Sequence, residues 1–347
     1  MSAESKPVAP PKQFFKYKFW GRHSLGLLIM AGLLGLALIW HVAVGATSLP
    51  VREVYSALFH YDAGNFNHLI IQNIRLPRAF VAILVGASLS VAGALMQGVT
   101  RNPLAEPGIL GLMAGASFAV VMVVALYPAV PADLLPGVAA LGAFLTASGV
   151  WIIAQSVPGG ATPLALTLTG AAITAFLGTL ISMVHLLSQD TFEQLRVWLA
   201  GSLAGRRLED VAITVPAIVL MLLFALGISR KVTVLAMGDA MAKGVGANTA
   251  WLKGQVLICV VVLTACSVSL AGPLGFVGLV VPHVVRLFVG SDYRWVVPYS
   301  AFVGAIYLLG VDMVARVLIR PEEISTGIIT AMIGAPLFIY LVRKRAR

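Results

Sequence analysis

Eight long apolar runs that contain no Asp, Glu, Lys or Arg constrain this chain more than any other feature of its sequence. They are residues 24–51, 79–100, 107–132, 134–189, 211–229, 254–285, 295–311 and 324–342. A helix needs about 20 apolar residues to cross the hydrocarbon core of a bilayer. Two runs are too long for one span, and each contains Gly and Pro residues that divide it, at 158–160 and at 272–273. The runs therefore predict an all-α polytopic membrane protein with ten transmembrane helices.

Positive charge at both ends of the chain indicates on which side of the membrane the ends lie. Residues 1–23 carry five Lys and Arg residues, and the last five residues carry four. Because Lys and Arg are retained on the cytoplasmic side, we expect both termini there, which requires an even number of spans. We therefore expect a basic cytoplasmic tail over residues 1–23 and a ten-span domain over residues 24–347. The first span has no signal-peptide cleavage site, and the net charge of +10 needs no nucleic-acid partner.

The outer face of this topology carries arginine and no lysine. Its positive residues are Arg52, Arg75, Arg78, Arg196, Arg206, Arg207, Arg316 and Arg320, whereas all eight lysines fall on the cytoplasmic side. One interpretation is compositional, because Arg outnumbers Lys two to one in the chain. The other is that the outer face binds carboxylates, which the forked guanidinium group contacts through two hydrogen bonds.

Residues 271–286, with the sequence AGPLGFVGLVVPHVVR, are apolar but contain helix breakers. We expect the helix to break at Gly-Pro and again at the second Pro. Backbone groups freed by such breaks must be buried in protein or line a water-filled cavity, and broken helices mark the pathways of many transporters. The predicted pathway residues are Gly272, Pro273, Gly275, Gly278, Pro282 and His283. For His283 alone, the sequence favours a hydrogen-bonded structural histidine over a pathway role.

A short internal repeat accompanies this segment. NPLAEPGIL (102–110) follows the second span and GPLGFVGLV (272–280) follows the seventh. These spans run in opposite directions, so the match indicates inverted five-span halves around a pathway near the membrane midplane. A match of this length is also compatible with chance in a chain with 34 Gly and 18 Pro residues.

The cytoplasmic segment 229–253 is the largest candidate for a partner contact. Asp239 is a favourable helix N-cap, and Gly244 or Gly246 would end the short helix that follows. The segment is either a docking element or an ordinary ordered loop. On the outer side, Pro77 in RLPR (75–78) would start the second span. Asp312 and Arg316 are four residues apart, so we expect them to pair, and Asp312 is otherwise a candidate functional carboxylate at membrane depth.

Several chemistries are not indicated by the sequence. No G-x-x-x-x-G-K-[ST] or H-E-x-x-H motif occurs, so we expect no nucleotide-binding loop and no catalytic activity in this chain. The two cysteines, Cys259 and Cys266, lie on one predicted span and do not suggest a disulfide. No Cys/His spacing suggests a metal site, and we expect no cofactor.

Six segments carry a resemblance to a known family. They are RLPRAFVAILVGASLSVAGALMQG, RNPLAEPGILG, WLAGSLAGR, GDAMAKGVG, GPLGFVGLVVPHVVRL and PEEISTGIITAMIGAPLFIYLVRK. On these motifs the chain resembles, over about residues 25–343, the FecCD-type permeases, which are the membrane subunits of ABC importers for ferric siderophores, haem and vitamin B12. Two positions depart from the family pattern: Ser325 stands where Pro is usual and Val245 where Leu is usual.

The resemblance implies an assembly and a set of roles. It implies two permease subunits, as a homodimer or with a paralogue, in a bacterial cytoplasmic membrane. A separate ATP-binding subunit would contact Gly238, Asp239, Ala242 and Gly246. A periplasmic or lipid-anchored binding protein would contact Arg75, Arg78 and Arg316. The substrate would be a ferric siderophore, and residues 189–207 suggest a catecholate type. Haem or vitamin B12 import is the alternative within the family. An ion-coupled secondary transporter is the alternative outside it.

Overall fold

The computed structural model describes residues 14–45, 47–131, 134–158, 160–206 and 208–345. Seven of its helices are long and apolar enough to cross a membrane, and three shorter helices are also apolar. The long ones are α1 (Phe14–Ala43), α4 (Leu76–Thr100), α6 (Leu135–Ser156), α7 (Pro163–Leu187), α9 (Leu208–Ala236), α11 (Thr249–Ala271) and α13 (Tyr293–Val317). The shorter ones are α5 (Leu112–Leu126), α12 (Val277–Val289) and α14 (Thr326–Arg345). These ten helices follow the order of the ten predicted spans, which confirms the predicted fold class.

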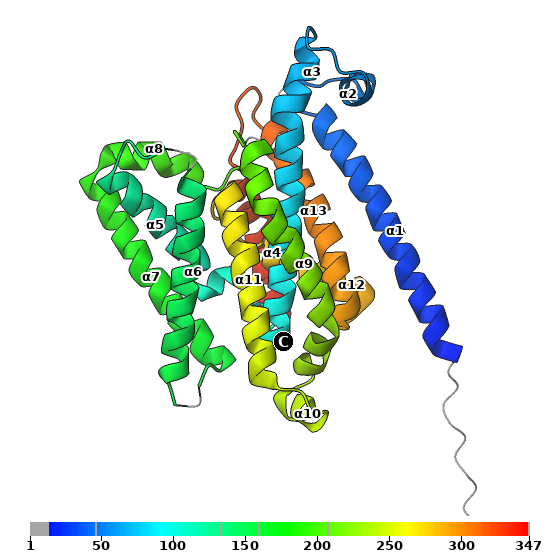
Figure 1. Cartoon of the computed structure of the whole chain (residues 1–347), viewed down its shortest axis with the longest axis vertical. Helices are drawn as coiled ribbons and strands as arrows, with labels where there is room; N and C mark the ends of the chain where they lie inside the picture. Colours follow the sequence, from blue (N-terminus) through cyan, green and yellow to red (C-terminus); the bar gives the residue numbers. More distant parts are fainter. Residues whose placement is uncertain (1–13, 46, 132–133, 159, 207, 346–347) are drawn as a thin grey trace, which may run out of the picture.

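The shorter elements gather at the two ends of the helix bundle (Figure 1). At one end lie α2 (Val51–Phe59), α3 (Phe66–Ile70) and α8 (Gln189–Leu199). At the opposite end lies α10 (Asp239–Gly244), and the start of α1 and the C-terminus lie toward that same end. Because α1 begins at Phe14, part of the predicted basic tail is helical, and the tail's first 13 residues lie outside the described part of the chain.

Helix α4 is the centre of the bundle. It packs against α9, α11, α12 and α13, and nearly all of its residues are buried. Small residues allow the neighbouring backbones to come this close. A Cβ atom added at Gly93 would lie 1.9 Å from the carbonyl oxygen of Gly278 in α12, and one at Gly86 would lie 2.3 Å from that of Gly304 in α13. Helices α12 and α13 therefore cross α4 at glycine-to-glycine contacts.

The start of the second span differs from the prediction. Helix α3, the π-helix η1 (Ile71–Arg75) and α4 form one continuous helical stretch over Phe66–Thr100. Pro77 therefore lies inside this stretch and does not start a span. The N–H of Leu76 bonds to the carbonyl of Ile71, five residues back, which is the wider spacing of a π turn. This wider turn lies just before a proline that cannot donate a backbone hydrogen bond.

The predicted pathway segment contains one break and not two. Helix α11 ends at Ala271, Gly272 has a φ of +69°, and α12 begins at Val277, so the break at Gly-Pro is confirmed. The second predicted break is wrong, because α12 continues through Pro282. A proline in a helix leaves the carbonyl four residues before it without its usual donor. Here that carbonyl belongs to Gly278, and the side-chain Nε2 of Gln97 in α4 donates to it at 3.2 Å.

Candidate functional site

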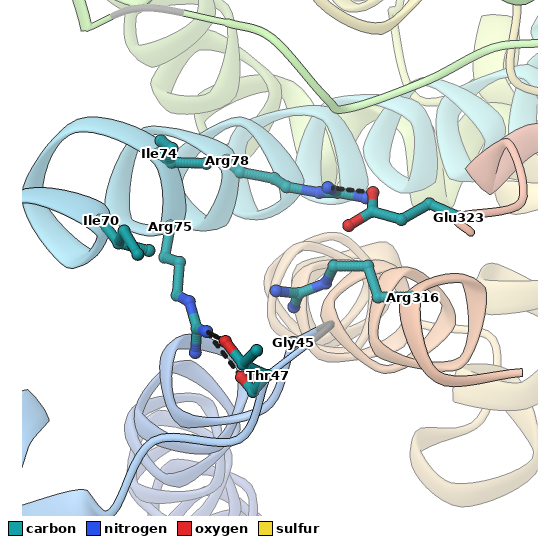
Figure 2. A pocket seen from close by; sticks show the side chains of 8 residues that line it. All are labelled: Gly45, Thr47, Ile70, Ile74, Arg75, Arg78, Arg316 and Glu323. Atoms are coloured by element: carbon teal, nitrogen blue, oxygen red, sulfur yellow. Dashed lines mark hydrogen bonds and ion pairs between the residues drawn. The ribbon is translucent and has the colours of Figure 1, made fainter. Parts of the chain in front are cut away.

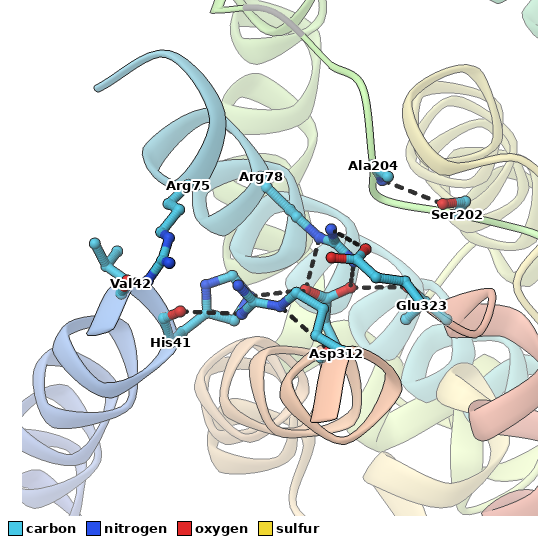
Figure 3. Close-up of polar contacts among 10 residues, drawn as sticks. His41, Val42, Arg75, Arg78, Ser202, Ala204, Asp312 and Glu323 are labelled. Atoms are coloured by element: carbon cyan, nitrogen blue, oxygen red, sulfur yellow. Dashed lines mark hydrogen bonds and ion pairs between the residues drawn. The ribbon is translucent and has the colours of Figure 1, made fainter. Parts of the chain in front are cut away.

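A fully buried carboxylate, Asp312 of α13, contacts charged residues at the end of the bundle opposite α10, which is the end predicted to be outer. Its side chain has no solvent exposure. Arg78 of α4 donates to it through two hydrogen bonds, from Nε to Oδ2 at 2.9 Å and from Nη2 to Oδ1 at 3.0 Å (Figure 3). This forked geometry is the strongest form of Arg–carboxylate pairing. A charge buried in an apolar bundle requires such compensation.

Three further residues contact the same carboxylate, one from α13 itself and two from other helices. Arg316 lies one turn along α13, with Nε 3.3 Å from Oδ2, which confirms the predicted Asp312–Arg316 pair. The ring Nε2 of His41 in α1 lies 2.9 Å from Oδ2, and the hydroxyl of Thr326 in α14 donates to Oδ1 at 2.9 Å. Asp312 thus joins α1, α4, α13 and α14. We call Asp312, His41, Arg78, Arg316, Glu323 and Thr326 the outer charge cluster.

The three predicted docking arginines lie together and are buried. Arg78 uses its remaining Nη1 to donate to Glu323 at 2.6 Å. The Arg75 guanidinium donates to the backbone carbonyls of Val42, Ala43 and Thr47 at 2.7, 2.9 and 2.7 Å. Arg316 donates from Nη2 to the carbonyl of His41 at 3.0 Å. Each guanidinium therefore has a partner within the chain.

A small pocket opens beside these arginines (Figure 2). Its volume is about 160 Å³, and it is lined by Gly45, Thr47, Ile70, Ile74, Arg75, Arg78, Arg316 and Glu323. Three guanidinium groups and one glutamate line it, and two of these arginines, Arg78 and Arg316, also contact Asp312. The three positive charges outnumber the two negative ones, so the pocket favours an anionic group. Of the other outer arginines, Arg196 pairs with Glu193 on α8 at 3.2 Å, and Arg207 lies outside the described residues.

The predicted coupling residues form a compact unit at the opposite end. Gly238, with a φ of +127°, is the N-cap of α10, so the assignment of the cap to Asp239 is wrong by one residue. The Asp239 carboxylate instead accepts from Lys253 at 3.0 Å and pairs with Arg101 at 3.1 Å. Partial burial opposes ionisation, but the hydrogen bond from Lys253 and the nearby charges hold the pKa of Asp239 below its ordinary value. Ala242 is fully buried.

Gly246 ends this helix as predicted. Its φ is +80°, and its N–H bonds to the carbonyl of Lys243. The N–H of Ala247 bonds to the carbonyl of Ala242, which completes a Schellman motif. Helix α9 extends to Ala236 and α11 begins at Thr249, so only the middle of the predicted 229–253 segment lies between long helices.

The predicted pathway residues lie in one short stretch that contacts the end of α8 and the loop that follows it. A Cβ atom at Gly272 would lie 2.4 Å from the carbonyl oxygen of Trp198. The N–H of Ser202 bonds to the carbonyl of Ala271 at 2.8 Å. Gly278 and Pro282 are buried in α12, whereas Pro273, Gly275 and His283 are partly exposed. The break is therefore enclosed by protein backbone, as a broken membrane helix requires.

Sequence reasoning missed several residues that complete these sites. His41, Glu323 and Thr326 belong to the outer charge cluster, and Gln97 and Glu106 contact α12. Glu106 was recognisable, because it is the one charged residue inside the repeated motif NPLAEPGIL. Within the described ranges, no group of three His, Cys, Asp or Glu side chains has the arrangement of a metal site.

Comparison with known proteins shows the family to which this chain is similar. Residues 33–344 match the FecCD transport family. The chain is 41% identical over 332 residues to the iron(3+)-hydroxamate import system permease protein FhuB of Bacillus subtilis, covering 94% of this chain and 86% of that protein. It is 41% identical over 324 residues to the Fe(3+)-citrate import system permease protein YfmD of the same organism, covering 92% and 93%.

Comparison with solved structures matches the same class of protein. An inward-facing metal-chelate type ABC transporter superposes with a TM-score of 0.81 at 30% identity, over 92% of this chain and 98% of that one. Sequence and fold therefore match the same class of protein over nearly the whole chain. The ten-helix bundle with a broken α11–α12 unit is that of a multi-pass membrane subunit of an iron-chelate importer. The chain belongs to the FecCD transport family, in its iron-siderophore branch.

Proposed function

We propose that this chain carries a ferric siderophore across the bacterial cytoplasmic membrane as one of two permease subunits, driven by ATP hydrolysis on a separate subunit. The observation that carries this proposal is α10. It is a compact capped helix at the end of the bundle toward which both termini lie. With the termini cytoplasmic, α10 faces the compartment that contains ATP.

The surface around α10 exposes apolar side chains, as surfaces that bind another protein do. Met237, Met241 and Val245 are spaced by four residues, and their exposed fractions are 68%, 55% and 67%. Exposed apolar side chains gathered beyond the ends of membrane helices favour a protein partner. Below this surface, Asp239 ties α10 to Arg101 at the end of α4 and to Lys253 in α11. A force applied to α10 would therefore reach both helices.

The test of this contact is the association of the permease with its ATPase. Deletion of residues 238–246 should abolish co-purification of the ATPase and transport, while the protein stays in the membrane. Met241→Glu should weaken the association, because it places a charge in the apolar contact, whereas Val157→Glu places the same charge on another exposed apolar residue, just after α6, and serves as a charge control. Normal co-purification of the deletion variant would show that α10 is not the docking element.

At the outer face we propose that carboxylates of a binding protein approach the pocket of Arg75, Arg78 and Arg316. Arg78 is already held by Glu323, which is partly exposed in the loop before α14. An incoming carboxylate would therefore compete with Glu323 for Nη1 of Arg78. Rim charges act mainly on the rate of association, so the effect is expected to be modest and sensitive to salt.

This competition has a direct test that leaves the buried pair intact. Glu323→Gln should tighten binding of the binding protein at low salt, because it frees a charged donor of Arg78. The neighbouring Glu322→Gln removes the same charge from an exposed side chain without that contact, so it serves as the matched control. Equal affinities for wild type and both variants would assign the arginines to the stability of the fold alone.

The substrate is tested with the full complex in proteoliposomes. We propose a siderophore of catecholate type from the outer segment 189–207, although the two relatives described above are named for hydroxamate and citrate systems. Uptake of radioactive iron should be compared for catecholate, hydroxamate and citrate chelates, with haem and cobalamin as the competing classes. Preference for the hydroxamate or citrate chelate would refute the catecholate assignment, and uptake of haem or cobalamin alone would refute siderophore transport.

A further inference from the structure

Glu106 contacts the start of α12 from a distant part of the chain. It lies between α4 and α5, and its Oε2 accepts a hydrogen bond from the backbone N–H of Phe276 at 3.2 Å. Phe276 is the N-cap residue of α12, and its own side chain provides no cap. The carboxylate therefore satisfies the N–H of the N-cap residue, which a Glu or Gln at the third helical position satisfies in a capping box.

The two partners occupy equivalent positions in the internal repeat. When NPLAEPGIL (102–110) is aligned with GPLGFVGLV (272–280), Glu106 falls on Phe276 and Gly108 on Gly278. In an inverted repeat, equivalent residues come into contact only where the axis that relates the halves passes between them. The Glu106–Phe276 hydrogen bond is the contact that the predicted inverted halves would make at their common axis.

Packing around this hydrogen bond is tight. A Cβ atom at Gly278 would lie 2.9 Å from Cδ of Pro107, the residue after Glu106. Phe276 has a φ of +68°, a left-handed conformation that residues with a side chain rarely adopt. A Cβ atom at Gly334 of α14 would lie 2.3 Å from Cβ of Phe276, so this phenylalanine lies directly on the α14 backbone. The α12 start is held from two sides in a conformation that it would not choose alone.

The loop that contains Glu106 also connects to the cytoplasmic end. The loop begins at Arg101, whose guanidinium pairs with Asp239 of α10 at 3.1 Å. The ten residues 101–110 form this loop, including the 3-10 turn at its end, Pro107–Leu110. The loop contacts α10 through Arg101 and the start of α12 through Glu106. A displacement of α10 has a short covalent and polar route to the break in the pathway helix.

We propose that Glu106 is a positioning residue for transport. Its carboxylate holds the start of α12 and the 272–276 break in place, and it couples them to the loop that pairs with α10 through Arg101. The role in transport rests on the proposed function, whereas the hold on α12 does not. Because the N–H of Phe276 needs an acceptor and not a charge, an amide at position 106 should serve almost as well as a carboxylate. A side chain of similar size without an acceptor should fail.

The variants that test this are Glu106→Gln and Glu106→Leu, with Asn102→Ala as the control. Asn102 accepts from the N–H of Leu104 in the same loop and does not contact α12 through that bond, so its loss perturbs the loop alone. Hydrogen–deuterium exchange of the purified permease is followed in peptides covering 272–280 and, as a reference, 112–126. In Glu106→Leu the first peptide should exchange about tenfold faster, the effect of one lost charge-assisted hydrogen bond. The reference peptide should be unchanged.

Transport by the reconstituted complex is measured on the same variants. Glu106→Leu should lose about tenfold in uptake per ATP hydrolysed, while Glu106→Gln and Asn102→Ala stay near wild type. If Glu106→Leu does not fold, Glu106→Asp, which is one methylene shorter, replaces it with the same expected direction. Wild-type exchange at 272–280 in Glu106→Leu, or in Glu106→Asp where it stands in, would overturn the proposal. Equal loss in Glu106→Gln and Glu106→Leu would overturn it too. If Glu106→Leu exchanges faster at 272–280 but the wild-type complex does not transport, only the proposed function is refuted.

Discussion

Replacing Asp312 by Asn is the sharpest perturbation of the outer charge cluster. The substitution keeps the size of the side chain and one carbonyl oxygen, but it removes the negative charge and replaces the other oxygen with an NH₂ donor. That oxygen, Oδ2, faces Nε of Arg78 at 2.9 Å, His41 at 2.9 Å and Nε of Arg316 at 3.3 Å. If the amide is flipped, the NH₂ group faces Nη2 of Arg78 and the hydroxyl of Thr326 instead. Either orientation leaves buried donors facing a donor.

The expected cost follows from the burial of both partners. Arg78 and Arg316 are 7% and 3% exposed, and Asp312 is not exposed at all. Breaking a buried ion pair by removing one partner costs about 3–5 kcal/mol, because the remaining charge is left uncompensated. Glu323 is the other carboxylate in the cluster, and it contacts Arg78 but not Arg316. We therefore expect Asp312→Asn to cost about 3–5 kcal/mol in the free energy of unfolding.

The assay is thermal unfolding of the purified protein in detergent, followed by fluorescence-detected size exclusion. The matched control is Glu193→Gln, which breaks the exposed Glu193–Arg196 pair on α8. An exposed pair is worth about 0–1 kcal/mol, so the control should melt near wild type. The double variant Asp312→Asn, Arg78→Gln should recover part of the loss, because it removes the uncompensated charge. Equal melting temperatures for Asp312→Asn and the Glu193 control would refute the reasoning.

Three further predictions concern other parts of the chain. Gly93→Ala should lower the free energy of unfolding by about 1–3 kcal/mol and reduce transport, because its Cβ would lie 1.9 Å from an α12 carbonyl oxygen. Gly35→Ala is the control, because a Cβ there would have no atom within 4 Å, and equal melting temperatures for the two variants would contradict the prediction. Because the hydrogen bond from Lys253 lowers the pKa of Asp239, the stabilisation of α10 by this carboxylate should be constant above about pH 4 and be lost at lower pH. The protection factors of the α10 amides, which correct the measured exchange rates for the intrinsic pH dependence of amide exchange, should therefore fall below about pH 4 in wild type; protection factors that stay constant with pH would count against this prediction. Gly246→Ala should destabilise α10 by about 1 kcal/mol, because φ is +80°, and normal ATPase affinity in this variant would argue against a role for the helix end.

The sequence predicts the spanning helices well because hydropathy reports the cost of exposing backbone and charge to lipid. The break at Gly272 was predictable for the same reason, since Gly-Pro both favours an unusual φ and lacks a donor. Pro282 also lacks a donor, but Val281 and not glycine precedes it, and α12 continues through it. Gln97 of α4 supplies the missing donor from 185 positions earlier in the chain. No local pattern contains that information.

The outer charge cluster was also predictable only in part, because most of its contacts join distant parts of the chain. The Asp312–Arg316 pair was predictable because both residues lie on one helix, four positions apart. Arg78 and His41 reach the same carboxylate across sequence separations of 234 and 271 residues. Their convergence depends on how α1 and α4 pack against α13, which single-sequence patterns do not specify. The wide π turn before Pro77 also had no local signal, because proline is favourable at the first turn of a helix.

The central claim is that this chain moves an iron chelate with energy supplied at its cytoplasmic end. The most direct measurement is uptake of a ferric siderophore into proteoliposomes that contain the permease, its ATPase and the binding protein, with ATP enclosed. We predict uptake that stops when ATP is omitted, that is unaffected by ionophores which collapse ion gradients, and that is lost on deletion of residues 238–246. Uptake that continues without ATP and disappears with the ionophores would contradict the account, because it would identify an ion-coupled transporter.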